Sequence, residues 1–139
     1  MIHFLLYTSN TFKPLAQTDL ALILEHARRN NAANGVTGIL LYAHTLVMQY
    51  LEGPRDAVDR TFEKIRRDPR HYGVQVLLRH DVRERRFDRW SMAFEPVGED
   101  AAVAGAIDLR STDPVPEDNG RLDAALMMLR NFREGIALM

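Results

Sequence analysis

The sequence has 139 residues, a formal net charge of −1, 46% hydrophobic and 27% charged residues, which is typical of one globular domain. The balance of charge argues against a general nucleic-acid binder, which carries a basic excess. The absence of cysteine excludes disulfides, zinc-finger sites, thiol nucleophiles and iron–sulfur ligation. No apolar run reaches the ~18 residues of a membrane-spanning helix, and the first residues lack a signal-peptide pattern. We therefore expect a cytoplasmic protein.

The first half of the chain predicts a strand, a helix and a hairpin. Residues 2–7 are apolar and partly aromatic, which favours a buried strand. Residues 15–33 carry apolar side chains at helical spacing, which predicts an amphipathic helix. The apolar stripe of this helix consists of Ala16, Leu20, Ile23, Leu24 and Ala27. Residues 36–43 and 46–52 predict two strands that are joined by a tight turn.

The second half predicts one more helix and two strands before the composition changes. A helix opens at Pro54, because proline suits the first helical position, and Pro69 ends it. Residues 74–79 predict a fourth strand. Residues 80–89 are mostly charged and predict a loop, and residues 90–94 predict a short fifth strand.

The predicted order β-α-β-β-α-β is that of the ferredoxin-like fold in the α+β class, here with an added fifth strand. Both helices then cover one face of an antiparallel sheet in which the first and third strands are neighbours. We assign residues 1–96 to one domain. Residues 97–139, with an amphipathic helix predicted at 121–136, are too short for a core of their own. We expect them to form a C-terminal helical extension that packs on the sheet or forms an oligomer interface.

Four polar residues stand where the patterns predict apolar ones. Asn30 and Asn31 occupy the next inward positions of the first helix. Gln49 lies between apolar neighbours on the inner face of the third strand, and Tyr7 ends the first strand. Each has an ordinary interpretation as a hydrogen-bonded helix end or a satisfied core group. Because the first and third strands are neighbours, the four side chains converge beneath the helices, which favours a site for a polar, planar ligand.

Other constellations indicate no catalytic chemistry. The histidines show no metal-ligand spacing and no serine sits in a nucleophile elbow. Trp90 and Met92 share one face of the fifth strand, as a packing pair would. An enzyme like acylphosphatase would need an arginine-bearing phosphate loop after the first strand, where residues 8–10 are uncharged. An RNA-binding sheet would need exposed aromatic residues and a basic surface.

Several short motifs occur together in one order between the tyrosine of the first strand and residue 92. These motifs are RNN at 29–31, GVTGILLY at 35–42, LEGP at 51–54, DPRH at 68–71 and RFDRWSM at 86–92. Together with Gln49 they resemble the BLUF domain, a blue-light sensor that uses flavin adenine dinucleotide. The resemblance covers residues 1–96. The fold of that family, a ferredoxin-like sheet with a fifth strand, agrees with the predicted elements.

The resemblance implies a role for nine residues. Tyr7 matches the tyrosine that donates an electron, and Gln49 matches the glutamine whose hydrogen bonds switch. Asn30 and Asn31 match amides that hydrogen-bond the flavin ring. Ala27 departs from members with serine or threonine there, which removes one flavin hydrogen bond. The remaining implied positions are Trp90 and Met92 in a light-responsive pair, Lys64 near the ring and ribityl chain, and Arg70 and His71 near the adenosine diphosphate.

The implied activity is a reversible photoreaction without net turnover, so the chain is not expected to be an enzyme. Excited flavin takes an electron from Tyr7, a proton follows through Gln49, and recombination leaves Gln49 rearranged and the absorption red-shifted. The expected cofactor is FAD, although FMN would suit the same ring cleft. We expect the signal to pass to a separate effector protein, through a homo-oligomer, with no nucleic-acid or membrane partner. A flavin-independent regulatory module on the same fold is the alternative.

Overall fold

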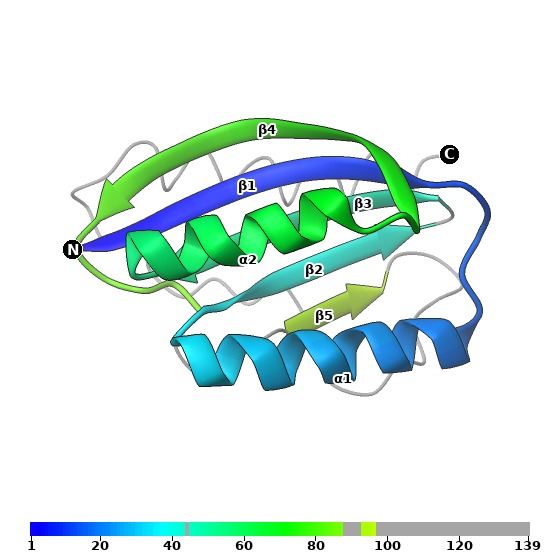
Figure 1. Cartoon of the computed structure of the whole chain (residues 1–139), viewed down its shortest axis with the longest axis horizontal. Helices are drawn as coiled ribbons and strands as arrows, with labels where there is room; N and C mark the ends of the chain where they lie inside the picture. The colour runs from blue at the N-terminus through cyan, green and yellow to red at the C-terminus, as the bar shows by residue number, and fades with distance from the viewer. Residues whose placement is uncertain (44, 88–92, 97–139) are drawn as a thin grey trace.

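Five strands and two helices make up the part of the chain that the computed structural model describes, namely residues 1–43, 45–87 and 93–96. Their order along the chain is β1 (Ile2–Thr11), α1 (Gln17–Asn34), β2 (Thr37–Ala43), β3 (Leu46–Gly53), α2 (Arg55–Arg67), β4 (His71–Val82) and β5 (Ala93–Pro96). The strands lie side by side in the order β4-β1-β3-β2-β5. Both helices lie on one face of this sheet (Figure 1). The predicted α+β ferredoxin-like fold with a fifth strand is confirmed.

The pairing of the strands places the two residues of greatest interest opposite each other. β1 pairs antiparallel with β3 on one side and with β4 on the other. β3 also pairs antiparallel with β2, whereas β5 lies parallel to β2. The predicted contact between the first and third strands is therefore correct. Its register puts Tyr7 directly across from Gln49.

Two strands are longer than the sequence predicts. β1 continues past Tyr7 to Thr11, because its polar last residues keep pairing with β3 and β4. The prediction that Tyr7 ends this strand is wrong. β4 covers His71–Val82 rather than 74–79, so the first residues of the predicted charged loop belong to a strand. An edge strand tolerates charged side chains, since one of its sides faces solvent.

The described part of β5 covers Ala93–Pro96, so this strand ends two residues later than the strand predicted at 90–94. Trp90 and Met92 lie outside the described residues, so their placement on this strand stays a prediction. The same holds for the extension at 97–139 and its predicted helix.

The end of α1 is fixed by one glycine. Gly35 has φ 70°, in the left-handed region that disfavours residues with a Cβ. The chain can then turn back, and the Val36 N–H donates to the Asn31 carbonyl at 2.9 Å. At the other end of α1, the Asp19 carboxylate accepts the Ala16 N–H at 3.3 Å. α1 therefore ends at Asn34, one residue beyond the predicted range of 15–33.

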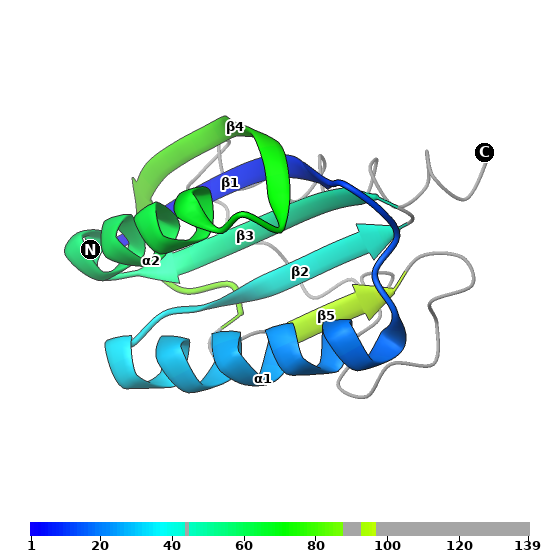
Figure 2. The ribbon, with the colours of Figure 1, turned by 45° about the vertical axis from the view of Figure 1, so that its right-hand side comes forward.

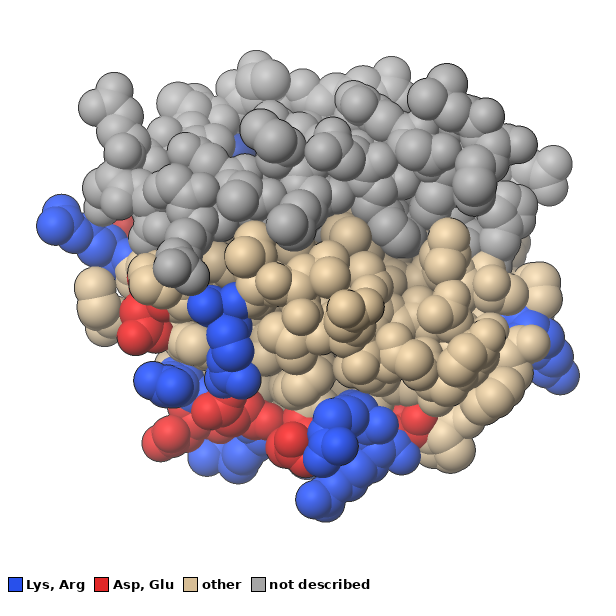
Figure 3. All heavy atoms as spheres, turned by 90° about the horizontal axis from the view of Figure 1, so that it is seen from above, with Lys and Arg blue, Asp and Glu red and all other residues tan. Residues whose placement is uncertain are grey.

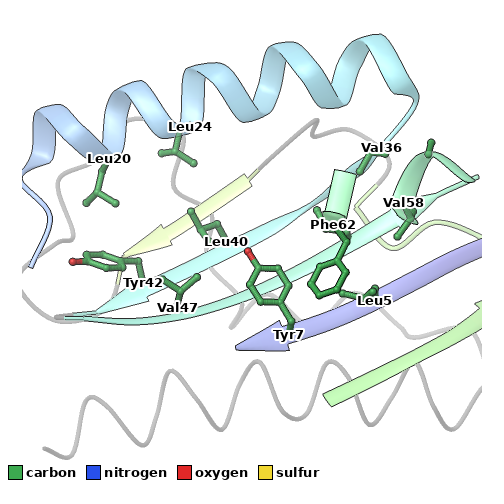
Figure 4. Close-up of a cluster of buried hydrophobic side chains, with 12 residues drawn as sticks. Leu5, Tyr7, Leu20, Leu24, Val36, Leu40, Tyr42, Val47, Val58 and Phe62 are labelled. Atoms are coloured by element: carbon green, nitrogen blue, oxygen red, sulfur yellow. The ribbon is translucent and has the colours of Figure 1, made fainter. Parts of the chain in front are cut away.

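Apolar side chains are buried on both faces of the sheet. Figure 4 shows the cluster on the helix face, where Leu20 and Leu24 of α1 point towards the sheet and Phe62 of α2 lies beside Tyr7. We call it the helix-face cluster; it contains Leu5, Tyr7, Leu20, Leu24, Val36, Leu40, Tyr42, Val47, Leu51, Ala57, Val58 and Phe62. The second, the rear cluster, contains Phe4, Leu6, Ile39, Leu41, Met48, Tyr50, Val82 and Phe87.

Charged side chains of both signs are mixed along the helix side of the molecule (Figure 3). Several of them form exposed pairs, such as Arg66 with Glu63 at 2.9 Å and Arg79 with Asp59 at 2.5 Å. Such surface pairs stabilise the fold only slightly.

Candidate functional site

A cavity of about 220 Å³ lies between the two helices, above β1, β2 and β3; we call it the inter-helix cavity. In Figure 2, α2 lies over β1 and β3, while α1 lies along the side of the sheet that carries β5. The apolar part of the lining of the inter-helix cavity consists of Leu15, Leu20, Ile23, Ala27, Leu40, Val47 and Ile65. The polar part consists of Tyr7, Thr11, His26, Asn30, Asn31, Asn34, Tyr42, Gln49, Thr61, Lys64, Asp68, Arg70 and His71.

Tyr7 and Gln49 meet on the floor of the cavity. They face each other across the β1–β3 pair, and both side chains are buried. The Tyr7 hydroxyl donates a hydrogen bond to Gln49 Oε1. Figure 4 shows the Tyr7 hydroxyl pointing away from β1, past Leu40 and towards the helix side. The sequence-based expectation that these two side chains meet is therefore correct.

The surroundings of Tyr7 keep its hydroxyl protonated. Burial raises the pKa of Tyr7 well above its usual value, and the negative charge of Asp68 raises it further. The ring of Phe62 packs against the Tyr7 ring, with 5.5 Å between the ring centroids. A buried phenol of this kind keeps its proton and donates a hydrogen bond to a neighbouring acceptor, which holds the ring in one orientation.

The two asparagines at the end of α1 differ in burial. Asn31 is 2% exposed, whereas the side chain of Asn30 is exposed, although both line the cavity. The prediction that both continue the buried stripe is thus right for Asn31 and wrong for Asn30. Successive helix positions are about 100° apart, so the rotation of α1 that buries Asn31 turns Asn30 towards the edge of the inward stripe. The pair instead lines the wall of the cavity from its buried depth to its edge.

The far end of α2 brings four charged or titratable side chains to the cavity. The Arg70 side chain donates to both Asp68 oxygens, from Nε at 3.0 and 3.1 Å and from Nη2 at 2.5 Å, and these hydrogen bonds lower the pKa of Asp68. His71 Nε2 donates to the Ile65 carbonyl at 2.5 Å, and Nδ1 lies 2.8 Å from the Ser9 hydroxyl. Within the described residues, Lys64 has no ion-pair partner.

The structure thus brings seven of the nine implied site residues to one cavity; Trp90 and Met92 are outside the described residues. Sequence reasoning missed His26, Tyr42 and Asp68 as lining residues. His26 lies one helical turn before Asn30, a spacing that could have identified it. Tyr42 gave no signal of its own, because it continues the apolar run of residues 39–41. Its hydroxyl accepts a hydrogen bond from the Leu15 N–H at 2.7 Å.

The described residues contain neither a candidate metal site nor a candidate membrane-spanning helix. In residues 1–43, 45–87 and 93–96, no group of three His, Asp or Glu side chains is placed to hold a metal ion. No helix within these ranges is long and apolar enough to cross a membrane.

Comparison with known proteins agrees with this geometry. Residues 2–93 match the family model of BLUF, described as sensors of blue-light using FAD. The chain is 39% identical over 89 residues to the photoactivated adenylate cyclase subunit beta of Euglena longa, which covers 63% of this chain. The chain spans only about a tenth of that relative's length.

Two solved structures share the fold. The dark state of BlrB, a BLUF protein, is 33% identical with a TM-score of 0.67, over 92% of this chain and 96% of that chain. Klebsiella pneumoniae BlrP1 with FMN and cyclic diGMP is 28% identical with a TM-score of 0.69, over 96% of this chain and 35% of that chain. With its fold, its cavity and the match over residues 2–93, this chain belongs to the BLUF family of blue-light sensors that bind flavin.

Proposed function

We propose that the light reaction of this sensor runs between flavin in the inter-helix cavity and the Tyr7–Gln49 pair. The observation that carries the proposal is the hydrogen bond from the Tyr7 hydroxyl to Gln49 Oε1, buried on the cavity floor. A phenol is a source of one electron and one proton. A glutamine amide both donates and accepts hydrogen bonds, so it can reverse its contacts without a change in charge.

The lining of the cavity fits a flavin. Apolar side chains from both helices and two strands suit the faces of a planar aromatic ring. The amides of Asn31 and Gln49 suit the polar edge of such a ring, because they offer donors and acceptors in a plane. Asn30, at the cavity edge beside Asn31, suits the same edge of the ring, and Lys64 suits the ring and the ribityl chain. Arg70 and His71 suit the more polar adenosine diphosphate. Ala27 lines the apolar wall and adds no hydrogen bond.

The residues of this chain then take part in a reaction cycle in which every electron and proton returns to its origin. When bound, excited flavin supplies a strong one-electron oxidant. Tyr7 gives up one electron, and its hydroxyl proton moves to Gln49 Oε1. The electron and proton return, and the Gln49 amide is left with its donor and acceptor groups exchanged. Atoms and electrons balance over the cycle, and the stored change is the hydrogen-bond pattern of Gln49.

Two matched tyrosine variants test this assignment. Tyr7→Phe removes the hydroxyl that contacts Gln49, so it should bind flavin but lose the light-induced red shift of the absorption spectrum. Tyr42→Phe removes another buried hydroxyl of the same cavity, which contacts the Leu15 N–H instead. It should keep the red shift. A Tyr7→Phe protein with a normal red shift would show that Tyr7 has no part in the reaction.

We propose FAD as the physiological flavin. The family description names FAD, whereas the neighbour BlrP1 contains FMN, so a flavin of either kind suits this fold. Arg70 and His71 line the outer cavity and suit the phosphates and the adenosine end of the dinucleotide. Mass spectrometry of the flavin released from purified protein distinguishes the two.

We also propose that residues 97–139 cover the rear face of the sheet. The rear cluster is buried, and both described helices lie on the other face.

We propose that Trp90 and Met92 respond to the switch of Gln49 and that the signal passes to an effector protein in the cytoplasm through a homo-oligomer. The passage of the signal to an effector is supported by the relative named a photoactivated adenylate cyclase, of which this chain spans about a tenth.

A further inference from the structure

A buried carboxylate lies on β3 close to the proposed photoswitch. Glu52 follows Gln49 by three positions, so it points to the opposite face of the sheet. Its exposure is 0%, the value of a core residue. A buried carboxylate persists only when hydrogen-bond donors surround it. Here burial raises the pKa of Glu52, and the hydrogen bonds and positive charge around it oppose that effect.

The donors to Glu52 come from two separate parts of the chain. The Arg86 and Phe87 backbone N–H groups donate to Glu52 Oε1 and Oε2, each at 2.6 Å. These residues belong to the segment between β4 and β5. The Thr37 hydroxyl, on the facing residue of β2, donates to Oε2 at 2.8 Å. Glu52 therefore fastens the segment that leads into β5 to the β2–β3 pair.

Arg85 extends this connection to the end of α1. Its guanidinium donates to the Thr37 hydroxyl at 3.1 Å and to the Gly35 carbonyl at 2.7 Å. Gly35 is the residue that ends the helix carrying Asn30 and Asn31. One cluster of hydrogen bonds thus joins the ends of α1 and β4 to the strand of Gln49.

The segment fastened by Glu52 also meets the neighbours of Gln49. The Phe87 ring packs edge-on against Tyr50, the residue after Gln49, with 5.3 Å between ring centroids. β5, which follows this segment, pairs with β2 at Leu40, and Leu40 faces Gln49 across the β2–β3 pair. Phe87, which Glu52 holds through its backbone N–H, is therefore packed against the residue next to Gln49.

We propose that Glu52 is a positioning residue of the light reaction: through the Arg86 and Phe87 amides it fixes Phe87 against Tyr50 on the strand of Gln49 and so sets how slowly Gln49 returns to its dark arrangement. This rests on the proposed role of Gln49. Loss of the anchor loosens the strands beside Gln49 and lowers the barrier for its return. The dark-recovery rate is then a direct measure of the anchor.

The test replaces the carboxylate by its neutral isostere in the full chain. In Glu52→Gln an amide NH2 faces at least one donor N–H, so one of the two backbone hydrogen bonds is lost. Flavin binding and the red shift should remain, and dark recovery should become faster by about tenfold. Hydrogen exchange at the Arg86 and Phe87 amides should become faster as well. The matched control Glu63→Gln alters an exposed carboxylate paired with Arg66 and should change neither rate.

The outcomes separate this inference from the proposed function. A folded Glu52→Gln protein with unchanged or slower recovery overturns the positioning role, even if its thermal stability falls. If Glu52→Gln does not fold, Thr37→Val provides a milder test, since it removes one donor to Glu52 and one acceptor of Arg85. It should also recover faster, and normal recovery there overturns the inference. Absence of a red shift in the wild-type protein would instead refute the proposed function.

Discussion

Individual side chains decide which chemistry the inter-helix cavity supports. Tyr7 and Gln49 are held by two different strands, yet the β1–β3 register brings them into direct contact. Neither side chain faces solvent, so the proton between them has no competing acceptor in bulk water. The pair therefore combines a protonated donor with an acceptor that can rearrange, which is the minimum that the proposed switch requires.

The ionisation of Tyr7 gives a pH dependence with a definite sign. Its folded-state pKa is raised above the ordinary value of about 10 by burial and by Asp68. The folded protein then holds a proton that the unfolded chain releases, so the free energy of unfolding falls as pH rises above about 10. In denaturant titrations at alkaline pH, the free energy of unfolding of Tyr7→Phe should fall less than that of wild type. Part of the fall should remain, because burial also raises the pKa of Tyr50. An identical fall in the two proteins would contradict the burial of an un-ionised Tyr7.

Lys64 offers a prediction about the flavin ring and its ribityl chain. Its side chain is exposed and lines the outer cavity, so Lys64→Ala should weaken FAD binding by about threefold, the effect of one solvent-screened charge. Riboflavin, which has the ring and the ribityl chain but no phosphate, should lose binding by the same factor. Arg66→Ala is the matched control, because Arg66 lies on the same helix, does not line the cavity and pairs with Glu63. Equal riboflavin binding by Lys64→Ala and wild type would instead place Lys64 at the phosphates.

At the level of helices and strands, the sequence predicts types better than lengths. The apolar runs at 2–7 and 74–79 identify β1 and β4, but backbone pairing carries both strands into polar residues. Side-chain hydropathy does not record such pairing. Ser9 shows how polar residues are accommodated, since its hydroxyl is buried and lies 2.8 Å from His71 Nδ1. The contact joins the extended ends of the same two strands and could not be read from either segment alone.

The end of α1 provides a test of how the site is positioned. A Cβ at Gly35 would meet no atom closer than 3.9 Å, so only the φ of 70° opposes a side chain there. Gly35→Ala should therefore lower the free energy of unfolding by about 1–2 kcal/mol. Gly35→Asn should lose less, because asparagine tolerates the left-handed region. Equal stability of Gly35→Ala and wild type in urea denaturation would mean that the helix end relaxes to another conformation.

For the molecule as a whole, the sheet carries an apolar cluster on each face, and each cluster must be shielded from solvent by other elements. The helices supply the first cover, and the order of strands and helices was enough to predict it, since β-α-β-β-α-β connections place both helices on one side. The convergence of Tyr7, Asn31 and Gln49 followed from the same topology. The exposure of Asn30 did not follow from the topology, because it depends on the exact rotation of α1.

The proposed second cover predicts the behaviour of a shortened chain. Removing residues 97–139 should expose the rear cluster, with Phe4, Leu6, Ile39 and Leu41 among its members. Exposed apolar surface of this kind favours association. The shortened chain should bind a hydrophobic dye, melt at lower temperature and aggregate, while any flavin bound keeps its red shift. A shortened chain with wild-type melting temperature and no dye binding would show that residues 97–139 do not cover this face.

The absorption spectrum of the purified wild-type protein before and after blue light tests the Tyr7–Gln49 switch most directly. Flavin bands should shift to the red on illumination and return in darkness, because Gln49 reverses its hydrogen bonds to the ring. Flavin bands that do not shift would contradict the role of the Tyr7–Gln49 pair. A protein that binds no flavin, even after added FAD, would contradict the assignment of the inter-helix cavity itself.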